Sequence, residues 1–278
     1  MLRYLKFLPV LIISLMWSSA ADATGPRVTT SLFTANQNEV HTIDFPPFVS
    51  SEVIEGGVAS ELVRTALSRG NIDADITIHP LRGMIRYYMI QEQAMAMLIR
   101  HESDMSDIKQ NLISVPLLKI KEGFYYYKPS HPQGVAWHKD FKSLKGFTYG
   151  AHYGEDVSAF EQAGIQVTFG RTMALMKQLV LGKIDFLKAP APTIEWLSKK
   201  YLGNEAKDFE RIDGAIFEDT LRVFFNRKHA EAAKAAKQFA AALESMKKDG
   251  TYEEIVNRHL ETTNKEGKPY LRRLDAVK

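Results

Sequence analysis

The sequence predicts an α/β fold of two lobes, each made of βαβ units and joined to the other by a hinge. Three observations lead to this prediction. Strand and helix patterns alternate along the chain, the same order of elements occurs twice, and two extended apolar segments accompany the second set. The chain has 278 residues, of which 45% are apolar, and this is enough for two lobes with cores of their own.

The first set of elements lies in the N-terminal part of the chain. Apolar residues recur at helical spacing after Gly57, and Gly70-Asn71 is typical of a helix end. Ile76 and Ile78 alternate with polar residues, which indicates a strand. In order, we expect a strand at 43, a helix from 58, a strand around 76–78, a helix opened by Pro80, and a buried strand at 94–99.

The second set repeats this order without similarity of sequence to the first. We expect strands at 146–150, 165–169 and 183–187, and helices at 155–163 and 172–181, the second of them capped by Thr172. Because βαβ crossovers are right-handed, each set should form a small parallel sheet covered by helices.

Two crossings and a helical C-terminal part complete the prediction. "GFYYYKP" (123–129) and "TLRVFFNRK" (220–228) are extended and apolar, and two crossings between two lobes predict a hinge. A helix from about 230 to 247 ends before Gly250, and a second helix follows. We therefore divide the chain into a signal peptide at 1–23, the first part of lobe 1 at 24–125, lobe 2 at 126–222, and a return to lobe 1 with the C-terminal helices at 223–278.

The first 23 residues predict export. Arg3 and Lys6 precede an apolar run at 7–17 that is too short to span a bilayer comfortably, and Ala21-Asp22-Ala23 is a typical cleavage pattern. We expect a cleaved signal peptide and a periplasmic protein. An uncleaved anchor is the alternative.

Charge and cysteine content exclude several classes of protein. The formal net charge is +3, and cleavage removes Arg3, Lys6 and Asp22, which leaves +2 (3 − 1), so a nucleic-acid partner is not expected. The absence of cysteine excludes disulfides, thiolate metal sites and a cysteine nucleophile. His131 and His138 are poorly spaced for a metal site, and we expect no metal and no cofactor.

Five motifs, in order along the chain, resemble the type II periplasmic solute-binding proteins of family 3, which include the polar amino-acid receptors of ABC importers. They are "FPPF" (45–48), "GGVASELV" (56–63) with Gly57 and Glu61, "LKGFTYGAHYGED" (144–156), "LVLGKIDFL" (179–187) and "MKKDGTYEEIVNRH" (246–259). The resemblance covers nearly all of the chain after the signal peptide. It implies the two-lobed type II fold, a small-molecule ligand between the lobes and an ABC permease as partner. We expect a monomer.

In that fold the corner after the first strand lines the cleft between the lobes. Prolines hold such a loop rigid because they fix φ and have no N–H that needs a partner. We therefore expect Phe45 to form a wall of the ligand site and Phe48 to lie in the core. A core position for both rings is the alternative.

The other candidates follow the carboxyl ends of predicted strands, where open α/β sheets bind their ligands. Arg82 and Arg100 either grip a ligand carboxylate or lie in solvent. His152 and Tyr153 are either polar contacts of a ligand or surface residues. Glu155 stands at a predicted helix start. Either its side chain caps this helix, or the residue contacts a ligand there.

Two departures from the family pattern concern the ligand. The family has a "T-x-x-R" segment where this chain has "HESDMSDIKQ" (101–110), and it has an aspartate for the ligand ammonium about where Pro190 stands here. Lys188 lies beside that position and is either a ligand contact or an exposed residue. A missing acid and an added lysine favour an anionic or carboxylate ligand over an ordinary α-amino acid.

We expect a binding protein, not an enzyme, because the sequence has no Ser-His-Asp order, metal-ligand cluster or phosphate-binding loop. A ligand-sensing partner of a membrane signalling protein is one alternative. A cyclohexadienyl dehydratase-like enzyme on the same fold, with Glu155 as its acid, is another.

Overall fold

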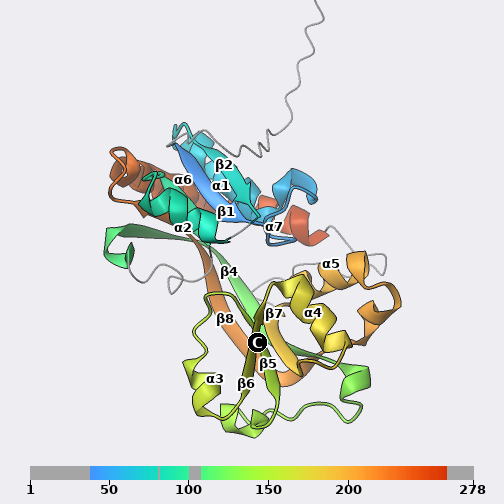
Figure 1. Ribbon diagram of the computed structural model, residues 1–278. Coiled ribbons are helices and arrows are strands. Elements are labelled where there is room, and N and C mark those ends of the chain that lie inside the picture. The colour runs from blue at the N-terminus through green and yellow to red at the C-terminus, as the bar shows by residue number, and fades with distance from the viewer. Residues whose placement is uncertain (1–37, 81, 100–107, 262–278) are drawn as a thin grey trace, which may run out of the picture.

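The computed structural model describes residues 38–80, 82–99 and 108–261 (Figure 1). The predicted signal peptide and Arg100 lie outside these residues. The described strands form one sheet in the order β2-β1-β3-β8-β4-β7-β5-β6. Their bounds are β1 Glu39–Ile43, β2 Asp75–His79, β3 Ala96–Ile99, β4 Leu112–Tyr127, β5 Thr148–His152, β6 Gln166–Gly170, β7 Phe186–Pro190 and β8 Phe209–Asn226.

The α-helices gather in two groups at the two ends of this sheet. Figure 1 shows α1, α2, α6 and α7 around β1–β3, and α3, α4 and α5 around β5–β7. We call the first group with its strands lobe 1 and the second lobe 2. The helix bounds are α1 Val58–Arg69, α2 Arg82–Ile90, α3 Ser158–Gln162, α4 Thr172–Val180, α5 Ala191–Tyr201, α6 Ala232–Asp249 and α7 Thr251–Glu261.

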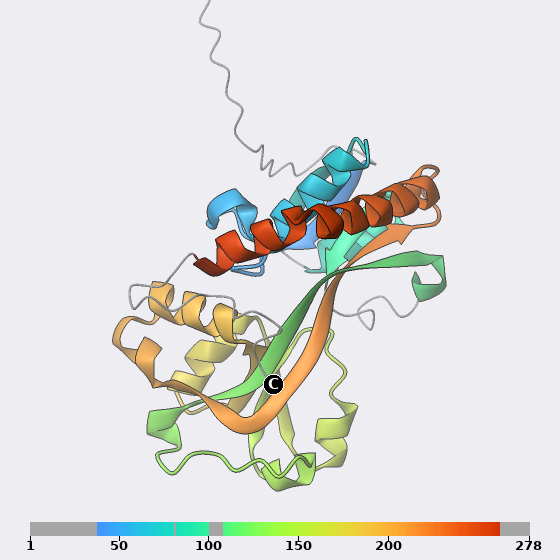
Figure 2. The same ribbon diagram turned by 180° about the vertical axis from the view of Figure 1, so that it is seen from behind.

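The long strands β4 and β8 connect the lobes. They pair antiparallel from Leu112 with Asn226 to Tyr127 with Phe209, and both therefore belong to both lobes (Figure 2). The two segments predicted as extended are strands, but each is one end of a longer strand and lies within a lobe: residues 123–125 pair with β7 of lobe 2, and residues 222–225 pair with β3 of lobe 1. Since both strands are continuous, the predicted lobe boundaries at 125 and 222 stay predictions.

The pairing directions bring the carboxyl ends of both sets of parallel strands toward each other. β1, β2 and β3 are parallel, and β3 runs opposite to β8, which enters lobe 1 from lobe 2. β5, β6 and β7 are parallel, and β7 runs opposite to β4, which enters lobe 2 from lobe 1. Each set therefore ends on the side of its lobe that faces the other lobe.

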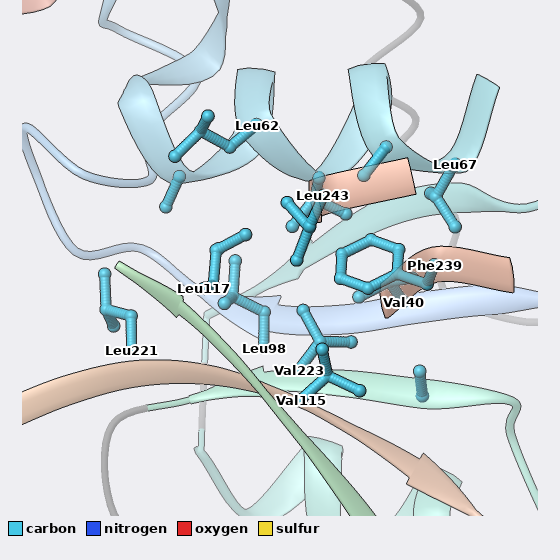
Figure 3. Packing of buried hydrophobic residues seen from close by; sticks show 14 of the residues in the cluster. Val40, Leu62, Leu67, Leu98, Val115, Leu117, Leu221, Val223, Phe239 and Leu243 are labelled. Carbon is cyan, nitrogen blue, oxygen red and sulfur yellow. The ribbon is translucent and has the colours of Figure 1, made fainter. Parts of the chain in front are cut away.

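The core of lobe 1 explains the helical spacing after Gly57. Leu62 and Leu67 of α1 pack toward the sheet, and Phe239 and Leu243 of α6 lie in the same cluster (Figure 3). All four side chains are at most 2% exposed. Burial of this apolar stripe is the main reason why the segment forms a helix, since propensity alone is a weak force.

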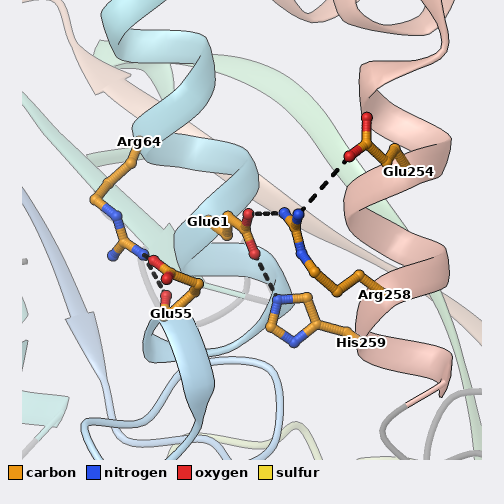
Figure 4. A network of polar contacts seen from close by, with 6 residues as sticks. All are labelled: Glu55, Glu61, Arg64, Glu254, Arg258 and His259. Carbon is orange, nitrogen blue, oxygen red and sulfur yellow. Dashed lines mark hydrogen bonds and ion pairs between the residues drawn. The ribbon is translucent and has the colours of Figure 1, made fainter.

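Residues of two family-like motifs hold α1 against α7 (Figure 4). Glu61 accepts a hydrogen bond from Arg258, and its other carboxylate oxygen lies 2.7 Å from His259 Nε2. At the other end of α1, Arg69 pairs with Asp249 and donates to the Thr251 hydroxyl at 2.6 Å. These contacts stabilise the packing of lobe 1.

Aromatic rings form the core of lobe 2 on the side of α3. Tyr149 stacks on Phe160 with ring centroids 4.1 Å apart, and the centroids of Phe124 and Phe186 lie 5.0 Å apart. Side chains alternate along a strand, so Lys188 of β7 lies on the same face as Phe186. Lys188 therefore lies at the edge of this aromatic core, two residues beyond Phe186 along β7.

The structure corrects the sequence predictions at four places in lobe 2. α3 begins at Ser158 instead of 155, so Glu155 lies before this helix and does not cap it. β7 begins at Phe186 instead of 183, so Lys188 and Pro190 lie within the strand. The prediction missed α5, because prolines obscure its helical pattern, although proline is favourable in the first turn of a helix. Thr172 is the first residue of α4 and makes no cap; its hydroxyl lies 3.0 Å from His152 Nε2 instead.

Candidate functional site

The "FPPF" corner follows β1 on the side of lobe 1 that faces lobe 2. The Pro46–Pro47 peptide bond is cis, and Phe45 exchanges backbone hydrogen bonds with Val49 at 2.7 and 2.9 Å. The rings of Phe45 and Phe48 stack with centroids 5.0 Å apart. Phe48 is 2% exposed, which confirms its predicted place in the core. Phe45 is partly buried against the same core, and its contact with a ligand stays a prediction.

Gly57 lies directly behind this corner. Its φ is +93°, and a Cβ atom at this position would lie 2.4 Å from the Phe48 carbonyl oxygen. The same oxygen accepts a hydrogen bond from Ala59 N at 2.9 Å, where α1 begins. Only glycine tolerates both the backbone conformation and the close approach, so the glycine of the motif has a structural role.

Lobe 2 carries a cluster of polar side chains at the carboxyl ends of β5 and β7. Glu155 lies at its centre, and its side chain is 9% exposed. Its Oε1 accepts a hydrogen bond from the Tyr149 hydroxyl at 2.7 Å and lies 3.1 Å from Lys188 Nζ. Its Oε2 accepts a hydrogen bond from His152 N at 3.1 Å. The structure thus brings together three of the predicted site residues: His152, Glu155 and Lys188.

Glu122 belongs to the same polar cluster and was missed in the sequence. It lies on β4 directly opposite Pro190 of β7 and is 2% exposed. Its Oε2 lies 4.0 Å from Lys188 Nζ. An acid therefore stands next to position 190, although position 190 itself is proline. A lone glutamate directly before the apolar run "GFYYY" was the signal that could have revealed it.

The surroundings of Glu155 keep its carboxyl group ionised. Burial by itself raises the pKa of this group, but hydrogen bonds from His152, the positive charge of Lys188 and the Tyr149 hydroxyl together bring the pKa well below its ordinary value. The Glu155 carboxylate and the buried side chain of Glu122 both lie close to Lys188 Nζ, at 3.1 and 4.0 Å.

Tyr153 is an exposed residue of lobe 2. Its ring is 58% exposed and lies nearly parallel to the ring of Phe169, with centroids 6.5 Å apart. Phe169 is near the end of β6 and is 42% exposed. Tyr153 directly follows β5, and Phe169 is the last residue but one of β6, so both lie toward the side of lobe 2 that faces lobe 1. Contact of Tyr153 with a ligand stays a prediction.

The two arginine candidates belong to lobe 1. Arg82 is the first residue of α2, which follows β2, so its backbone lies at the carboxyl end of a strand. Its side chain and the whole of Arg100 lie outside the described part of the chain. Their role as ligand contacts stays a prediction.

A buried pair of histidines lies beneath α2. His41 Nδ1 and His79 Nε2 are 2.7 Å apart, and both rings stack on Tyr88. Burial, with a smaller effect of His79, lowers the pKa of His41 to about 3, and burial also lowers the pKa of His79. Both rings are therefore neutral at physiological pH and act as part of the core.

Within the described ranges, no group of three or more His, Cys, Asp or Glu residues is arranged to hold a metal ion. Among the helices that the structure describes, none is both long enough and apolar enough to cross a membrane.

Solved structures of other proteins share this two-lobed arrangement, although no family model and no curated protein matches the chain. The ligand-binding core of GluR0 from Nostoc punctiforme, in complex with L-glutamate, is 16% identical with a TM-score of 0.61, over 79% of this chain and 97% of that chain. AbpA, an amino acid ABC transporter substrate-binding protein from Streptococcus pneumoniae bound to L-arginine, is 14% identical with a TM-score of 0.58, over 80% and 94%.

A histidine kinase sensor domain with similarity to periplasmic binding proteins is 14% identical with a TM-score of 0.61, over 79% of this chain and 95% of that domain. These neighbours share the fold of the type II periplasmic binding proteins. The chain therefore has the two-lobed type II periplasmic binding protein fold that its motifs predicted.

Proposed function

We propose that this chain is a periplasmic solute-binding protein that captures a small polar ligand with a carboxylate group between its lobes and delivers it to an ABC importer. The observation that carries the proposal is the opposition of the carboxyl ends of the two sets of strands. α/β sheets bind ligands at these ends. Here a single ligand can touch both sets and thereby favour closure of the lobes.

The carboxylate part of the proposal rests on Lys188. An ammonium group has three donors, so a ligand oxygen can bind Lys188 in addition to Glu155. Arg82 and Arg100 follow strands of lobe 1 and would approach the same ligand from the other side. Glu122 also lies near Lys188, and an acid would attract a positively charged group of a ligand. A binding experiment should therefore compare carboxylates with compounds that carry a positive group beside the carboxylate.

Export and partners follow from the sequence. Residues 1–23 have the pattern of a cleaved signal peptide, which would bring the mature chain to the periplasm. We infer a monomer that contacts an ABC permease of the inner membrane.

Sensing is the second candidate function, because one structural neighbour is a histidine kinase sensor domain. The genes beside this one distinguish the two: a permease and an ATPase favour import, and a membrane kinase favours sensing. An enzyme of the cyclohexadienyl dehydratase kind has less support. Glu155 is the acid that the sequence suggests for it, and a carboxyl with a lowered pKa is a poor proton donor at neutral pH.

A thermal-shift experiment tests the ligand class. Succinate and citrate would be compared with the α-amino acids L-arginine, L-lysine and L-histidine, since a compound that binds only the native state raises the melting temperature. We expect the carboxylates to give the largest rise. Lys188→Met should abolish this rise, and Lys177→Met, an exposed lysine of α4, should keep it. A largest rise with L-arginine, L-lysine or L-histidine would show that the carboxylate assignment is wrong.

A further inference from the structure

The two lobes also touch through charged side chains. Glu52 follows the "FPPF" corner in lobe 1, and Lys200 and Tyr201 form the end of α5 in lobe 2. Glu52 Oε2 lies 2.5 Å from Lys200 Nζ and accepts a hydrogen bond from the Tyr201 hydroxyl at 3.4 Å. We call these three side chains the interlobe contact.

The interlobe contact lies away from the strands that connect the lobes. Figures 1 and 2 show α5 on one side of lobe 2, while β4 and β8 pass between the lobes on the other side. A rotation of the lobes about these strands would therefore separate Glu52 from Lys200 early. For a given rotation of the lobes, two atoms far from the hinge move farther apart than two atoms beside it. A contact far from the hinge is therefore broken by a small rotation and opposes opening more effectively.

Lobe 2 positions Lys200 for this contact. Its Nζ lies 4.6 Å from the ring centroid of Trp196 and 5.2 Å from that of Tyr201, both of which belong to α5. Cation–π attraction to these rings restricts the ammonium group. Less conformational entropy is then lost when it meets Glu52.

Both partners are charged at neutral pH. A hydrogen bond from Lys200 lowers the pKa of Glu52, and the hydrogen bond with Glu52 raises the pKa of Lys200. Lys200 also acts on a second acid of lobe 1: burial raises the pKa of Asp44, and the charge of Lys200 opposes this rise. Negative charge on lobe 1 thus faces positive charge on lobe 2.

We propose that the interlobe contact stabilises the closed arrangement of the lobes without a ligand and thereby sets the fraction of molecules that is ready to retain one. The apparent affinity of a protein for its ligand scales with the population of its competent state. Glu52, Lys200 and Tyr201 are thus positioning residues that determine affinity without touching the ligand. This inference depends on the two-lobed fold and not on the identity of the ligand.

The effect should be moderate and sensitive to salt. The side chains of Lys200 and Glu52 are 35% and 47% exposed, so water and ions screen their attraction. For Glu52→Gln we expect the ratio of open to closed molecules to rise roughly two- to fivefold, as for other exposed ion pairs. Charge reversal should have a larger effect, because it adds repulsion.

Pulsed electron paramagnetic resonance can measure this ratio without any ligand. The chain has no cysteine, so spin labels on cysteines introduced at Lys237 of α6 and Lys177 of α4 report a single distance between the lobes. Both positions are exposed. The variants are Glu52→Lys, Lys200→Glu and the double exchange. Glu244→Lys is the matched control, since Glu244 pairs with Lys247 at 2.7 Å within α6.

Each single reversal should increase the population at long distance, and the double exchange should restore the short distance of the wild type. The control should leave the distribution unchanged, and 1 M NaCl should act on the wild type as Glu52→Gln does. Distances unchanged in both single variants, or no restoration in the double exchange, would overturn the proposal. Melting curves verify that each variant, Glu52→Gln included, is folded. An unchanged distance distribution in Glu52→Gln would also count against the proposal. Since no ligand is added, either result leaves the proposed binding function open to its own test.

Discussion

The ammonium group of Lys188 lies 3.1 Å from the Glu155 carboxylate and links the carboxyl ends of β7 and β5. The two side chains are 19% and 9% exposed, so most of their contact is shielded from water. The Oε2 atom of Glu122, nearly fully buried, lies 4.0 Å from the same ammonium group. Because Lys188 contacts both acids, loss of the lysine removes the partner of both, whereas loss of Glu155 leaves it only the more distant Glu122.

Glu155→Gln should destabilise the protein by about 2–3 kcal/mol at pH 7, because Lys188 loses its nearer acidic partner and the Tyr149 hydroxyl loses a charged acceptor. The pKa of Glu155 is lower in the folded than in the unfolded protein, so its stabilising effect is complete above its ordinary pKa of 4.5 and is lost as pH falls below that value. The difference between wild type and variant should therefore shrink by about 1.4 kcal/mol per pH unit below 4.5 in urea unfolding. Glu161→Gln, on the exposed face of α3, is the control. A difference that stayed constant down to pH 3.5 would contradict this account.

His41 should make the protein less stable in mild acid. Its pKa is about 3 in the folded state against an ordinary value of 6.5, so only the unfolded chain takes up this proton just below pH 6.5. The contribution of His41 is present above pH 6.5 and falls by about 1.4 kcal/mol per pH unit below it. His41→Gln should flatten the slope of unfolding free energy between pH 6.5 and 5.5, and His138→Gln, which changes an exposed ring, should not. An NMR titration of His41 with a midpoint near pH 6.5 would disprove the assignment.

The two rings of the "FPPF" corner should respond differently to truncation. Phe48→Ala should cost about 3–5 kcal/mol of stability, because it removes a fully buried ring. Phe45→Ala should cost less, since this ring is only partly buried. For the compound with the largest thermal shift, however, Phe45→Ala should weaken binding by roughly 1–3 kcal/mol. Calorimetry and melting of both variants test this. Equal melting and unchanged affinity would mean that Phe45 is only scaffold.

Gly57→Ala should destabilise the protein by roughly 2–4 kcal/mol, because a methyl group 2.4 Å from the Phe48 carbonyl forces the backbone to move. Gly83→Ala is the matched control. Gly83 lies in α2, and in the described part of the chain no atom beyond its chain neighbours and its own helix backbone lies within 4 Å of an added Cβ, so alanine should be neutral or stabilising by up to about 1 kcal/mol. Chemical unfolding of both variants gives the comparison, and similar values for the two would refute the role of Gly57.

Local periodicity in the sequence was sufficient for the order of most elements. The helix after Gly57, the strand at 94–99 and the helix that ends before Gly250 all appear near their predicted places. The spacing of apolar residues shows which side of a helix or strand becomes buried, and this spacing can be read from a short stretch of sequence. Glu155 and Lys188 were predicted as site residues for a similar reason, because each lies near the end of a recognisable strand.

Only the tertiary structure decided which side chains meet. Strand register places Glu122 opposite Pro190, so an acid reaches a position where the sequence shows none. The approach of the lobes brings Tyr201 to Glu52 across 149 residues of chain. Such pairings depend on how strands align and how lobes pack, and no local pattern encodes a register between segments that are distant in sequence. The sequence by itself determined the elements and their order, and the packing of those elements decided the partners of each charge.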